Sequence, residues 1–277
     1  QQAVLVLGLG LSGLALARWC ARCGARVTVA DTRPVPPQLH ALQESVPSAQ
    51  FIHTDMGAEL LDGQDWRMVL KSPGLSPAEI SGVVAAAQAQ GLPCGNELSL
   101  FAQALADLQQ SQAYAPKVIG ITGTNGKTTV TALTGRLLER AGKLVAVAGN
   151  IGPTLLDTLT ERLDAGALPD VWVLELSSFQ LDQINTFEPT VATVLNLSQD
   201  HLDWHGSMQA YSAAKFNVYG RQGLMLLNRD DAAVMASLPL PVKGKQLRDY
   251  TTFGGGVPQR PGDYGMETVN GMAWLVR

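Results

Sequence analysis

Short apolar runs that end in glycine, serine or an acidic residue recur along the chain, separated by stretches with helical spacing. The first run, Ala3–Leu7, leads through a glycine-rich turn into the helical stretch Leu14–Cys23. Apolar runs of this kind are typical of strands buried on both faces, and their alternation with helices predicts mostly parallel sheets. Because ligands of such sheets bind at the carboxyl ends of the strands, the residues that follow each run are the candidates for function.

The first turn reads Gly8-Leu9-Gly10-Leu11-Ser12-Gly13, a G-x-G-x-x-G pattern between a strand and a helix. A second strand, Arg26–Ala30, ends at Asp31, and Gly24 is suited to cap the intervening helix. This is the βαβ start of a Rossmann-like fold, in which a helix N-terminus receives phosphate and the acidic residue reaches a ribose. The pattern predicts a ligand that carries phosphate but does not say which one.

A second glycine loop, Gly123–Thr128, reads G-T-N-G-K-T and follows the apolar run Lys117–Ile121. Its glycines can turn backbone N–H groups toward phosphate oxygens, while a lysine neutralises the β- and γ-phosphates and a threonine reaches Mg²⁺. The spacing departs from the general P-loop pattern, which would require a glycine at Ile121. We nevertheless predict an ATP site formed by Gly123, Thr124, Asn125, Gly126, Lys127, Thr128 and Thr129.

Other strand ends of the C-terminal part carry polar residues. Glu175 follows an apolar strand, and we expect it to hold Mg²⁺, although an acidic residue at a helix start is also favoured by the helix dipole. The residue types leave His201 open between a structural role and a general base, since Mg²⁺ prefers oxygen ligands. Lys215, taken alone, is interpreted as a surface lysine, and Asn150 as either a substrate ligand or a turn former.

Length and composition favour two α/β domains. The chain has 277 residues, of which 46% are hydrophobic and 16% charged, enough for two cores. A new strand–loop–helix unit starts at Lys117, and we place the boundary within Leu92–Glu97, giving domains 1–93 and 94–277. The expected fold is therefore a Rossmann-like domain followed by a P-loop-type ATPase domain with a parallel sheet. Near the end, Asn270-Gly271 predicts a hairpin between Tyr264–Val269 and Met272–Val276.

Charge and cysteine content exclude several classes of protein. A net charge of −4 without a lysine or arginine cluster argues against nucleic acid as a partner, and no apolar stretch suits membrane insertion. Three cysteines indicate a reduced, cytoplasmic setting rather than a disulfide scaffold. Cys20 and Cys23 form a C-x-x-C, but they fall inside a helical pattern and are predicted to pack a helix rather than bind metal.

Together these motifs resemble the Mur ligases of peptidoglycan synthesis, over nearly the whole chain. The residues that carry the resemblance are Gly8–Gly13, Asp31–Arg33, Ser72–Gly74, Gly123–Thr128, Gly149–Gly152, Leu174–Leu181, Asn196–Gly206 and Ala213–Lys215. The resemblance implies an ATP-dependent, ADP-forming acid–D-amino-acid ligase that serves cell wall biogenesis, cell shape and cell division. The stretch Leu174–Gln180 resembles the corresponding stretch of the member that adds D-glutamate to UDP-N-acetylmuramoyl-L-alanine. The protein is expected to be a monomer.

The resemblance also implies roles for individual residues. Lys127, His201 and Lys215 would be catalytic, with Lys127 on the γ-phosphate. One Mg²⁺ would be held by Thr128 and Glu175, and a second by His201 and a carbamylated Lys215. The reaction would form an acyl phosphate at the L-alanine carboxylate, which the D-glutamate amine then attacks. The UDP-substrate would be bound by Leu11, Ser12, Asp31, Thr32, Arg33, Gly74, Asn150 and Ser177, with His201 also bordering the muramyl part.

In one respect the chain departs from the family pattern. Mur ligases have a third, C-terminal domain that closes over ATP and supplies most D-glutamate contacts, whereas this sequence ends at Arg277 and begins with Gln1. We therefore expect a fragment that lacks the D-glutamate-binding domain and its native start. Such a fragment is expected to bind the UDP-substrate, to bind nucleotide weakly and to be inactive as a ligase.

Three other functions compete with this interpretation. An NAD-dependent oxidoreductase would explain Gly8–Gly13 and Asp31, but not the Gly-Lys-Thr loop or Glu175. Another ligase of the superfamily, such as a folylpolyglutamate synthase or the ligase that adds L-alanine, is disfavoured by Ser177–Gln180. The third alternative is a non-enzymatic module that senses UDP-sugars.

Overall fold

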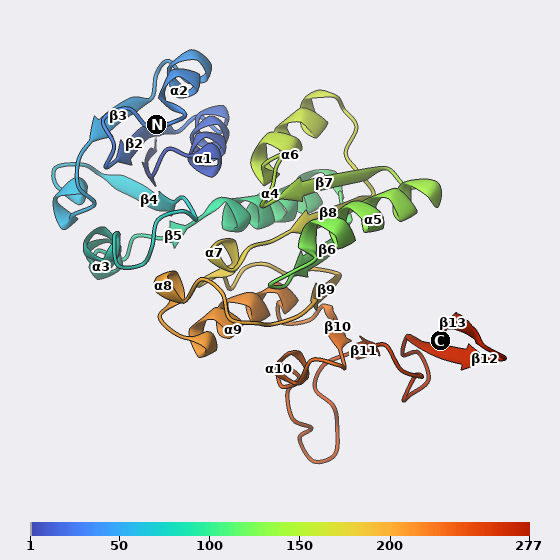
Figure 1. Ribbon diagram of the computed structural model, residues 1–277. Coiled ribbons are helices and arrows are strands. Elements are labelled where there is room, and N and C mark those ends of the chain that lie inside the picture. Colours follow the sequence, from blue (N-terminus) through green and yellow to red (C-terminus); the bar gives the residue numbers. More distant parts are fainter. Residues whose placement is uncertain (1) are drawn as a thin grey trace. The chain divides into compact units, whose positions relative to one another are not determined.

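The computed structural model describes residues 2–277, which divide into two compact units (Figure 1). Unit 1 contains the chain up to Tyr114 together with Gly152–Leu168, and unit 2 contains Ala115–Ile151 with Pro169–Arg277. Each unit is built on its own parallel sheet. Within residues 2–277 no helix combines the length and the apolar character needed to cross a membrane.

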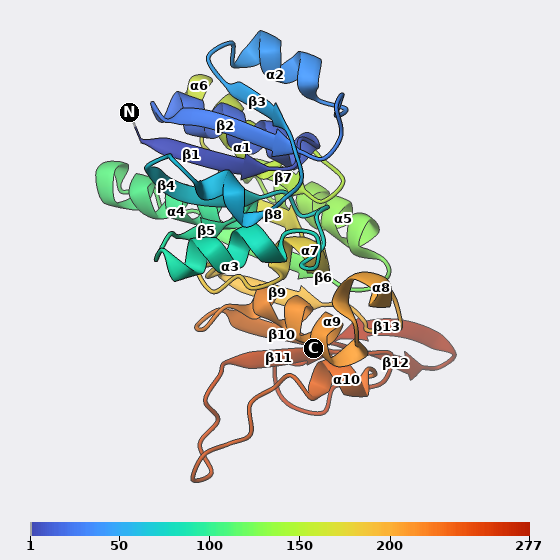
Figure 2. The same ribbon diagram turned by 90° about the vertical axis from the view of Figure 1, so that its left-hand side faces the viewer.

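The sheet of unit 1 has five strands in the order β3-β2-β1-β4-β5, and all neighbouring strands are parallel (Figure 2). This is the strand order 3-2-1-4-5-6 of a dinucleotide-binding fold without its sixth strand. Every residue of the central strand β1 is buried, which explains its unbroken apolar run. The strands are β1 (Ala3–Leu7), β2 (Arg26–Asp31), β3 (Gln50–His53), β4 (Trp66–Lys71) and β5 (Cys94–Gly95).

The helices of unit 1 are α1 (Leu11–Arg22), α2 (Leu39–Ser45), η1 (Ala58–Leu61), α3 (Ser81–Ala89), α4 (Glu97–Gln112) and α6 (Leu155–Asp164). Helix α1 begins at Leu11 rather than at Leu14, so the second half of the glycine motif forms its first turn. Gly13 is required there because a Cβ atom would collide with the carbonyl oxygen of Gly8. The sequence analysis did not anticipate α2, β3 or α6.

The contacts place the boundary between the units after Tyr114, beyond the position expected from the sequence. The physical reason is that α4 packs against α1 and α6, and so belongs to unit 1. Contacts between residues do not test where a family domain ends, so the division after residue 93 stays a prediction.

The sheet of unit 2 has six parallel strands in the order β11-β10-β9-β6-β8-β7. Strand β6 therefore lies between β8 and β9, which brings the carboxyl ends of these three strands together. The strands are β6 (Lys117–Thr122), β7 (Val145–Gly149), β8 (Val171–Glu175), β9 (Val191–Val194), β10 (Leu224–Asn228) and β11 (Tyr250–Phe253). The helices are α5 (Lys127–Arg140), α7 (Ser178–Leu181), α8 (Leu202–His205), α9 (Met208–Phe216), η2 (Asn217–Tyr219) and α10 (Ala232–Met235).

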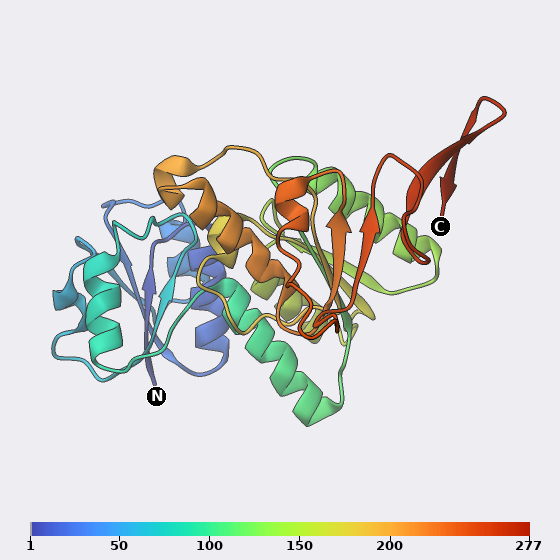
Figure 3. The same cartoon turned by 90° about the horizontal axis from the view of Figure 1, so that it is seen from below.

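The predicted C-terminal hairpin is confirmed. Strands β12 (Gly265–Val269) and β13 (Met272–Val276) pair antiparallel, and Figure 3 shows them in red at the end of the chain. Asn270 and Gly271 both have positive φ, +52° and +79°, as a type I′ turn requires.

Candidate functional site

The phosphate loop of unit 2 connects β6 to α5. Gly123 has φ +154°, and a Cβ atom there would lie 3.0 Å from the Cβ of Leu195. Gly126, with φ +81°, is the N-cap of α5, and no side chain caps this helix. The first N–H groups of α5 are thus open to an anion, as the loop sequence predicts.

Two lysine side chains meet at this loop. Lys127 Nζ donates to the carbonyl oxygens of Gly123 (3.0 Å) and Thr124 (3.1 Å), and Lys215 Nζ donates to the same Gly123 oxygen at 2.9 Å. Lys215 is only 2% exposed and lies 4.7 Å from the centroid of the Tyr211 ring. The interpretation of Lys215 as a surface lysine is therefore wrong, because α9 turns this side chain into the core beneath the loop.

Burial of Lys215, and secondarily the nearby cation, perturb its titration. Burial, and then the neighbouring Lys127, lower the pKa of Lys215 to about 7, while Asp200 opposes the shift. Two ammonium groups that share one carbonyl oxygen create a positive region beside an uncapped helix N-terminus. An anionic ligand in the loop would offset this repulsion.

The loop is braced by Asn196, which the sequence analysis did not assign to the site. Its side chain accepts from the N–H of Asn125 (2.9 Å) and donates to the Asn125 carbonyl (3.1 Å), while its own carbonyl accepts from the N–H of Thr124 (3.0 Å). Strand β9 ends at Val194, and these bonds turn the following residues to the loop. The sequence signal that could have identified Asn196 is its place as a polar residue just after β9, the strand beside β6.

A cavity of about 250 Å³ opens over the loop. Glu175, at the end of β8, is 4% exposed, and its Oε1 accepts from the side-chain amide of Asn150 at 3.2 Å. The residues that line the cavity are Thr124, Asn125, Gly126, Lys127, Thr128, Thr129, Asn150, Ile151 and Glu175. The structure thus gathers most of the predicted ATP-binding residues with Asn150 and one predicted magnesium pair, Thr128 and Glu175.

The chemistry of this pair fits Mg²⁺, which prefers carboxylate and hydroxyl oxygens. Among residues 2–277 no group of three or more His, Cys, Asp and Glu residues is arranged to hold a metal ion. A magnesium ion here would therefore need ligands from phosphate and water as well, which is its usual behaviour beside nucleotides.

The predicted residues His201 and Ser177 lie outside the cavity lining. His201 has φ +50° and 47% of its side chain is exposed, and its Nε2 lies 3.4 Å from Asp200 Oδ2. The His201 ring centroid is 4.7 Å from that of Phe179. Two residues earlier, the Ser177 hydroxyl caps α7 by accepting from the Gln180 N–H. The roles predicted for His201 and Ser177 stay predictions.

In unit 1 the predicted UDP-binding residues lie at or just after the carboxyl ends of the neighbouring strands β1, β2 and β4, with Leu11 and Ser12 in the first turn of α1. Helix α1 starts without a side-chain cap, and Leu11 is 63% exposed. Gly74 follows β4 and has open space where a Cβ atom would stand. The residues concerned are Leu11, Ser12, Asp31, Thr32, Arg33 and Gly74.

Asp31 is 2% exposed, and both of its carboxylate oxygens are occupied by its own chain. Oδ2 accepts from the Leu9 N–H (2.7 Å) and from Arg33 Nη2 (2.7 Å), and Oδ1 accepts from Arg33 Nε (2.8 Å) and from its N–H (2.9 Å). Burial alone would raise the pKa of Asp31, but the Arg33 and Leu9 bonds outweigh it and hold the pKa below its usual range. Asp31 therefore orders the loop around Arg33.

Glu97, the first residue of α4, was also missed by the sequence analysis. It is 1% exposed, and its Oε1 accepts from the N–H of Leu156 at 3.1 Å. No local pattern marks it, because its partner comes from another helix, α6.

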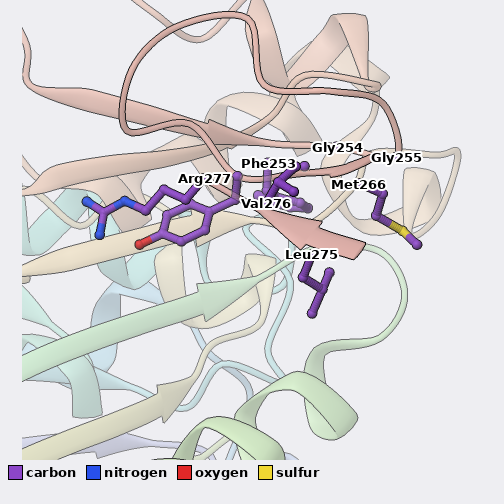
Figure 4. A pocket seen from close by; sticks show the side chains of 9 residues that line it. Phe253, Gly254, Gly255, Met266, Leu275, Val276 and Arg277 are labelled. Atoms are coloured by element: carbon purple, nitrogen blue, oxygen red, sulfur yellow. The ribbon is translucent and has the colours of Figure 1, made fainter. Parts of the chain in front are cut away.

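A second cavity of unit 2, of about 590 Å³, lies where the hairpin meets the end of β11 (Figure 4). Its lining is mostly apolar or glycine, including Phe253, Met266 and Leu275, with Arg277 as its charged member. It offers no set of acid, base or phosphate-binding groups, so the phosphate-loop cavity is the better candidate for an active site.

Two family models match the chain. Residues 2–95 match the Mur ligase MurD-like, N-terminal domain, and residues 121–254 match the Mur ligase middle domain. Between them they cover the glycine-rich loops of both units and the residues that contact them.

Curated relatives agree with these matches. The chain is 65% identical to a UDP-N-acetylmuramoylalanine--D-glutamate ligase of Albidiferax ferrireducens, over all of the chain and 56% of the relative. It is 56% identical to the protein of the same name from Paraburkholderia phymatum, over 99% of the chain and 54% of the relative. The chain thus spans about half the length of the curated relatives it matches.

Solved structures share the fold at lower identity. A UDP-N-acetylmuramate:L-alanyl-gamma-D-glutamyl-meso-diaminopimelate ligase from Neisseria meningitides has a TM-score of 0.56 and 17% identity, covering 99% of this chain and 84% of that one. A murein peptide ligase from Psychrobacter arcticus gives a TM-score of 0.51, also at 17% identity, covering 98% of this chain and 56% of that one. From its two domain matches, its relatives and the glycine loops they cover, this chain belongs to the Mur ligase family.

Proposed function

We propose that this chain provides the UDP-substrate site and the ATP site of a ligase that adds D-glutamate to UDP-N-acetylmuramoyl-L-alanine. The identity of 65% to a relative of that name supports the choice of substrate. The observation that carries the ATP site is the meeting of Lys127 and Lys215 on the Gly123 carbonyl, beside an uncapped helix and across from Glu175. The positive charge of such a site would be neutralised by a bound polyanion.

In the proposed ATP complex the loop amides bind the phosphates, and Lys127 leaves the loop carbonyls to contact the γ-phosphate. Thr128 and Glu175 would hold Mg²⁺, and Asn150 would orient the Glu175 carboxylate through the bond seen here. When bound, Mg²⁺ neutralises charge on the phosphate oxygens. Burial of Glu175 fixes the position of this carboxylate before the ligand arrives.

A second Mg²⁺, held by His201 and Lys215, is part of the same proposal. With a pKa of about 7, Lys215 has a substantial fraction of neutral amine near neutral pH. A neutral amine can attack carbon dioxide, forming an N–C bond and releasing one proton to water. The resulting carbamate would replace a cation by an oxygen ligand of the kind that Mg²⁺ prefers.

In the whole enzyme the L-alanine carboxylate would attack the γ-phosphorus of ATP, releasing ADP and forming an acyl phosphate. The amine of D-glutamate would then attack the acyl carbon, and inorganic phosphate would leave. Lys127 would stabilise the charge that develops on the transferred phosphoryl group. Both UDP-sugars and ATP are cytoplasmic compounds, and we place the enzyme in the cytoplasm as a monomer.

Binding measurements on this chain test the proposal. Mg²⁺ with a non-hydrolysable ATP analogue, and UDP-N-acetylmuramoyl-L-alanine, are each expected to raise the melting temperature. Lys127→Met should abolish the nucleotide effect and keep the UDP-substrate effect, while Lys143→Met, at an exposed lysine, serves as the matched control. Equal nucleotide binding by Lys127→Met and the wild type would contradict the ATP site.

The competing oxidoreductase is disfavoured by Asp31. A ribose-binding carboxylate needs a free lone pair for the 2′-hydroxyl, whereas each oxygen of Asp31 already accepts two hydrogen bonds. Stabilisation by NADH, without stabilisation by the UDP-substrate, would reverse this conclusion.

A further inference from the structure

Helix α5 turns two of its leucines to solvent and its small residues to the sheet. Thr131 is 2% exposed, Gly135 is buried, and a Cβ atom at Gly135 would lie 2.7 Å from Val147 Cγ2 on the edge strand β7. Leu133 and Leu137, by contrast, are 55% and 57% exposed. This reverses the usual arrangement, in which a helix on a sheet directs its large apolar side chains to the core.

The packing of α5 on its sheet depends on other side chains. The helix lies against β6, β7 and β8 (Figure 1). Its partly buried residues Val130 and Leu138 pack on the core cluster formed by Ile121, Val145, Val171 and Val173. The two exposed leucines are not part of this cluster, and large apolar side chains that are exposed together mark an interaction surface.

The apolar surface continues beyond the helix. Leu144, which precedes β7, is 44% exposed, and Val147 is 36% exposed. The N–H of Lys143 donates to the Leu138 carbonyl at 3.1 Å and holds this turn against the last turns of α5. We call this surface the α5 patch; it consists of Leu133, Leu137, Leu144 and Val147.

Three exposed cations accompany the patch: Arg136 and Arg140 on α5, and Lys143 just after it. Each arginine follows one of the exposed leucines by three positions, so the helix places it beside that leucine. None of the ion pairs in residues 2–277 involves these three cations. A positive apolar surface thus forms on a chain whose net charge is −4.

We propose that the α5 patch binds to the surface of an anionic lipid bilayer. The leucines would enter the boundary between headgroups and acyl chains, and the three cations would meet the lipid phosphates. Helix α5 would lie in the plane of the interface, with its other side still on the sheet. The lining of the phosphate-loop cavity includes α5 only as far as Thr129, so the lipid surface and the nucleotide would use different parts of the helix.

Charge favours this occupant over a second copy of the chain. A two-fold contact through the α5 patch would place three cations opposite the same three cations, with Glu139 as the one acidic residue of the helix. An anionic bilayer offers negative charge over the whole plane, and the apolar stems of arginine and lysine can lie beside the leucines while their charged ends reach the headgroups.

Flotation of this chain with lipid vesicles tests the proposal. The vesicles are phosphatidylcholine alone, or phosphatidylcholine with about 30% phosphatidylglycerol as the anionic lipid. We expect binding to the anionic vesicles at low salt, at least about tenfold weaker binding to the neutral ones, and a steep loss of affinity as the salt concentration rises.

Two double variants separate charge from apolar contact. Arg136→Gln with Arg140→Gln should weaken binding to anionic vesicles about 25-fold, since each cation near such a surface contributes about fivefold. Leu133→Gln with Leu137→Gln keeps the cations and should weaken binding at least about tenfold. Both variants change exposed side chains, so the melting temperature and its rise with Mg²⁺ and the ATP analogue should stay as in the wild type.

Matched controls lie outside the patch. Arg67→Gln with Lys117→Gln removes two exposed cations, and Leu240→Gln removes a leucine that is 84% exposed. Both controls should bind vesicles as the wild type does, and equal weakening by either would overturn the assignment to α5. Absence of wild-type binding to anionic vesicles would overturn the proposal as a whole. A dimer in light scattering that Leu133→Gln with Leu137→Gln dissociates, without vesicle binding, would assign the patch to a second copy instead.

Discussion

Replacing Glu97 with glutamine is expected to stabilise unit 1 relative to the wild type at pH 8 by more than it does at pH 5. In the folded chain the Glu97 carboxyl is almost completely buried, and burial raises its pKa from 4.5 to about 7. Ionisation of Glu97 therefore costs more free energy in the folded chain than in the unfolded chain. An amide of the same shape has no proton to lose.

The sign and size follow from proton linkage. A folded pKa above the unfolded one means that the contribution to stability is complete below pH 4.5 and is lost as the pH rises through about 7. A rise of this size corresponds to about 3 kcal/mol of unfolding free energy in total. Between pH 5 and pH 8, the variant should gain about 2 to 3 kcal/mol relative to the wild type.

The assay must report on unit 1 separately, since two units need not unfold together. Cys20 lies buried in α1 and serves as the probe in a urea series with a brief pulse of a thiol reagent. Trypsin can cleave after Arg18 and Arg22, so the Cys20 peptide is separated from the exposed Cys23.

Glu161→Gln is the control, because its carboxylate is exposed on α6. It should follow the wild type across the pH range. An unfolding free-energy difference between Glu97→Gln and the wild type that stays constant from pH 5 to pH 8 would refute the raised pKa and the linkage argument.

Three further predictions concern the loops. Asn196→Ala removes the side-chain brace of the phosphate loop and should weaken ATP binding about tenfold in equilibrium titration, whereas unchanged affinity would show that the loop holds itself. Gly123→Ala should lower the unfolding free energy by about 2 kcal/mol in urea, since φ is +154° and the Leu195 side chain is in the way; an unchanged midpoint would count against it. Arg33→Ala removes bonds that hold the pKa of Asp31 low, so it should destabilise unit 1 at pH 7. The difference in unfolding free energy from the wild type should shrink as the pH falls and Asp31 is protonated. The urea series with the Cys20 probe measures this difference, and a difference that does not change with pH would contradict the prediction.

The parallel sheets and both glycine loops could be predicted because their causes are local. Buried strands have continuous apolar runs, glycines are needed at positive φ, and a lysine after the second loop suits phosphate. The hairpin turn at Asn270-Gly271 could also be predicted, because asparagine and glycine adopt the positive φ that such a turn requires. Segments without such signals, among them α6 and β3, were missed, and α6 joins unit 1 although its neighbours in sequence form unit 2.

The sequence by itself determined the two βα phosphate loops and the alternation of buried parallel strands with helices, because each depends on residues within one or two turns of chain. Only the tertiary structure decided the environments of Lys215, Asn196 and Glu97, whose partners lie 92, 71 and 59 positions away. Burial and charge are properties of what packs around a side chain. For that reason Lys215, interpreted from the sequence as a surface residue, is a buried neighbour of Lys127, and burial at the contact with α6 raises the pKa of Glu97 to about 7.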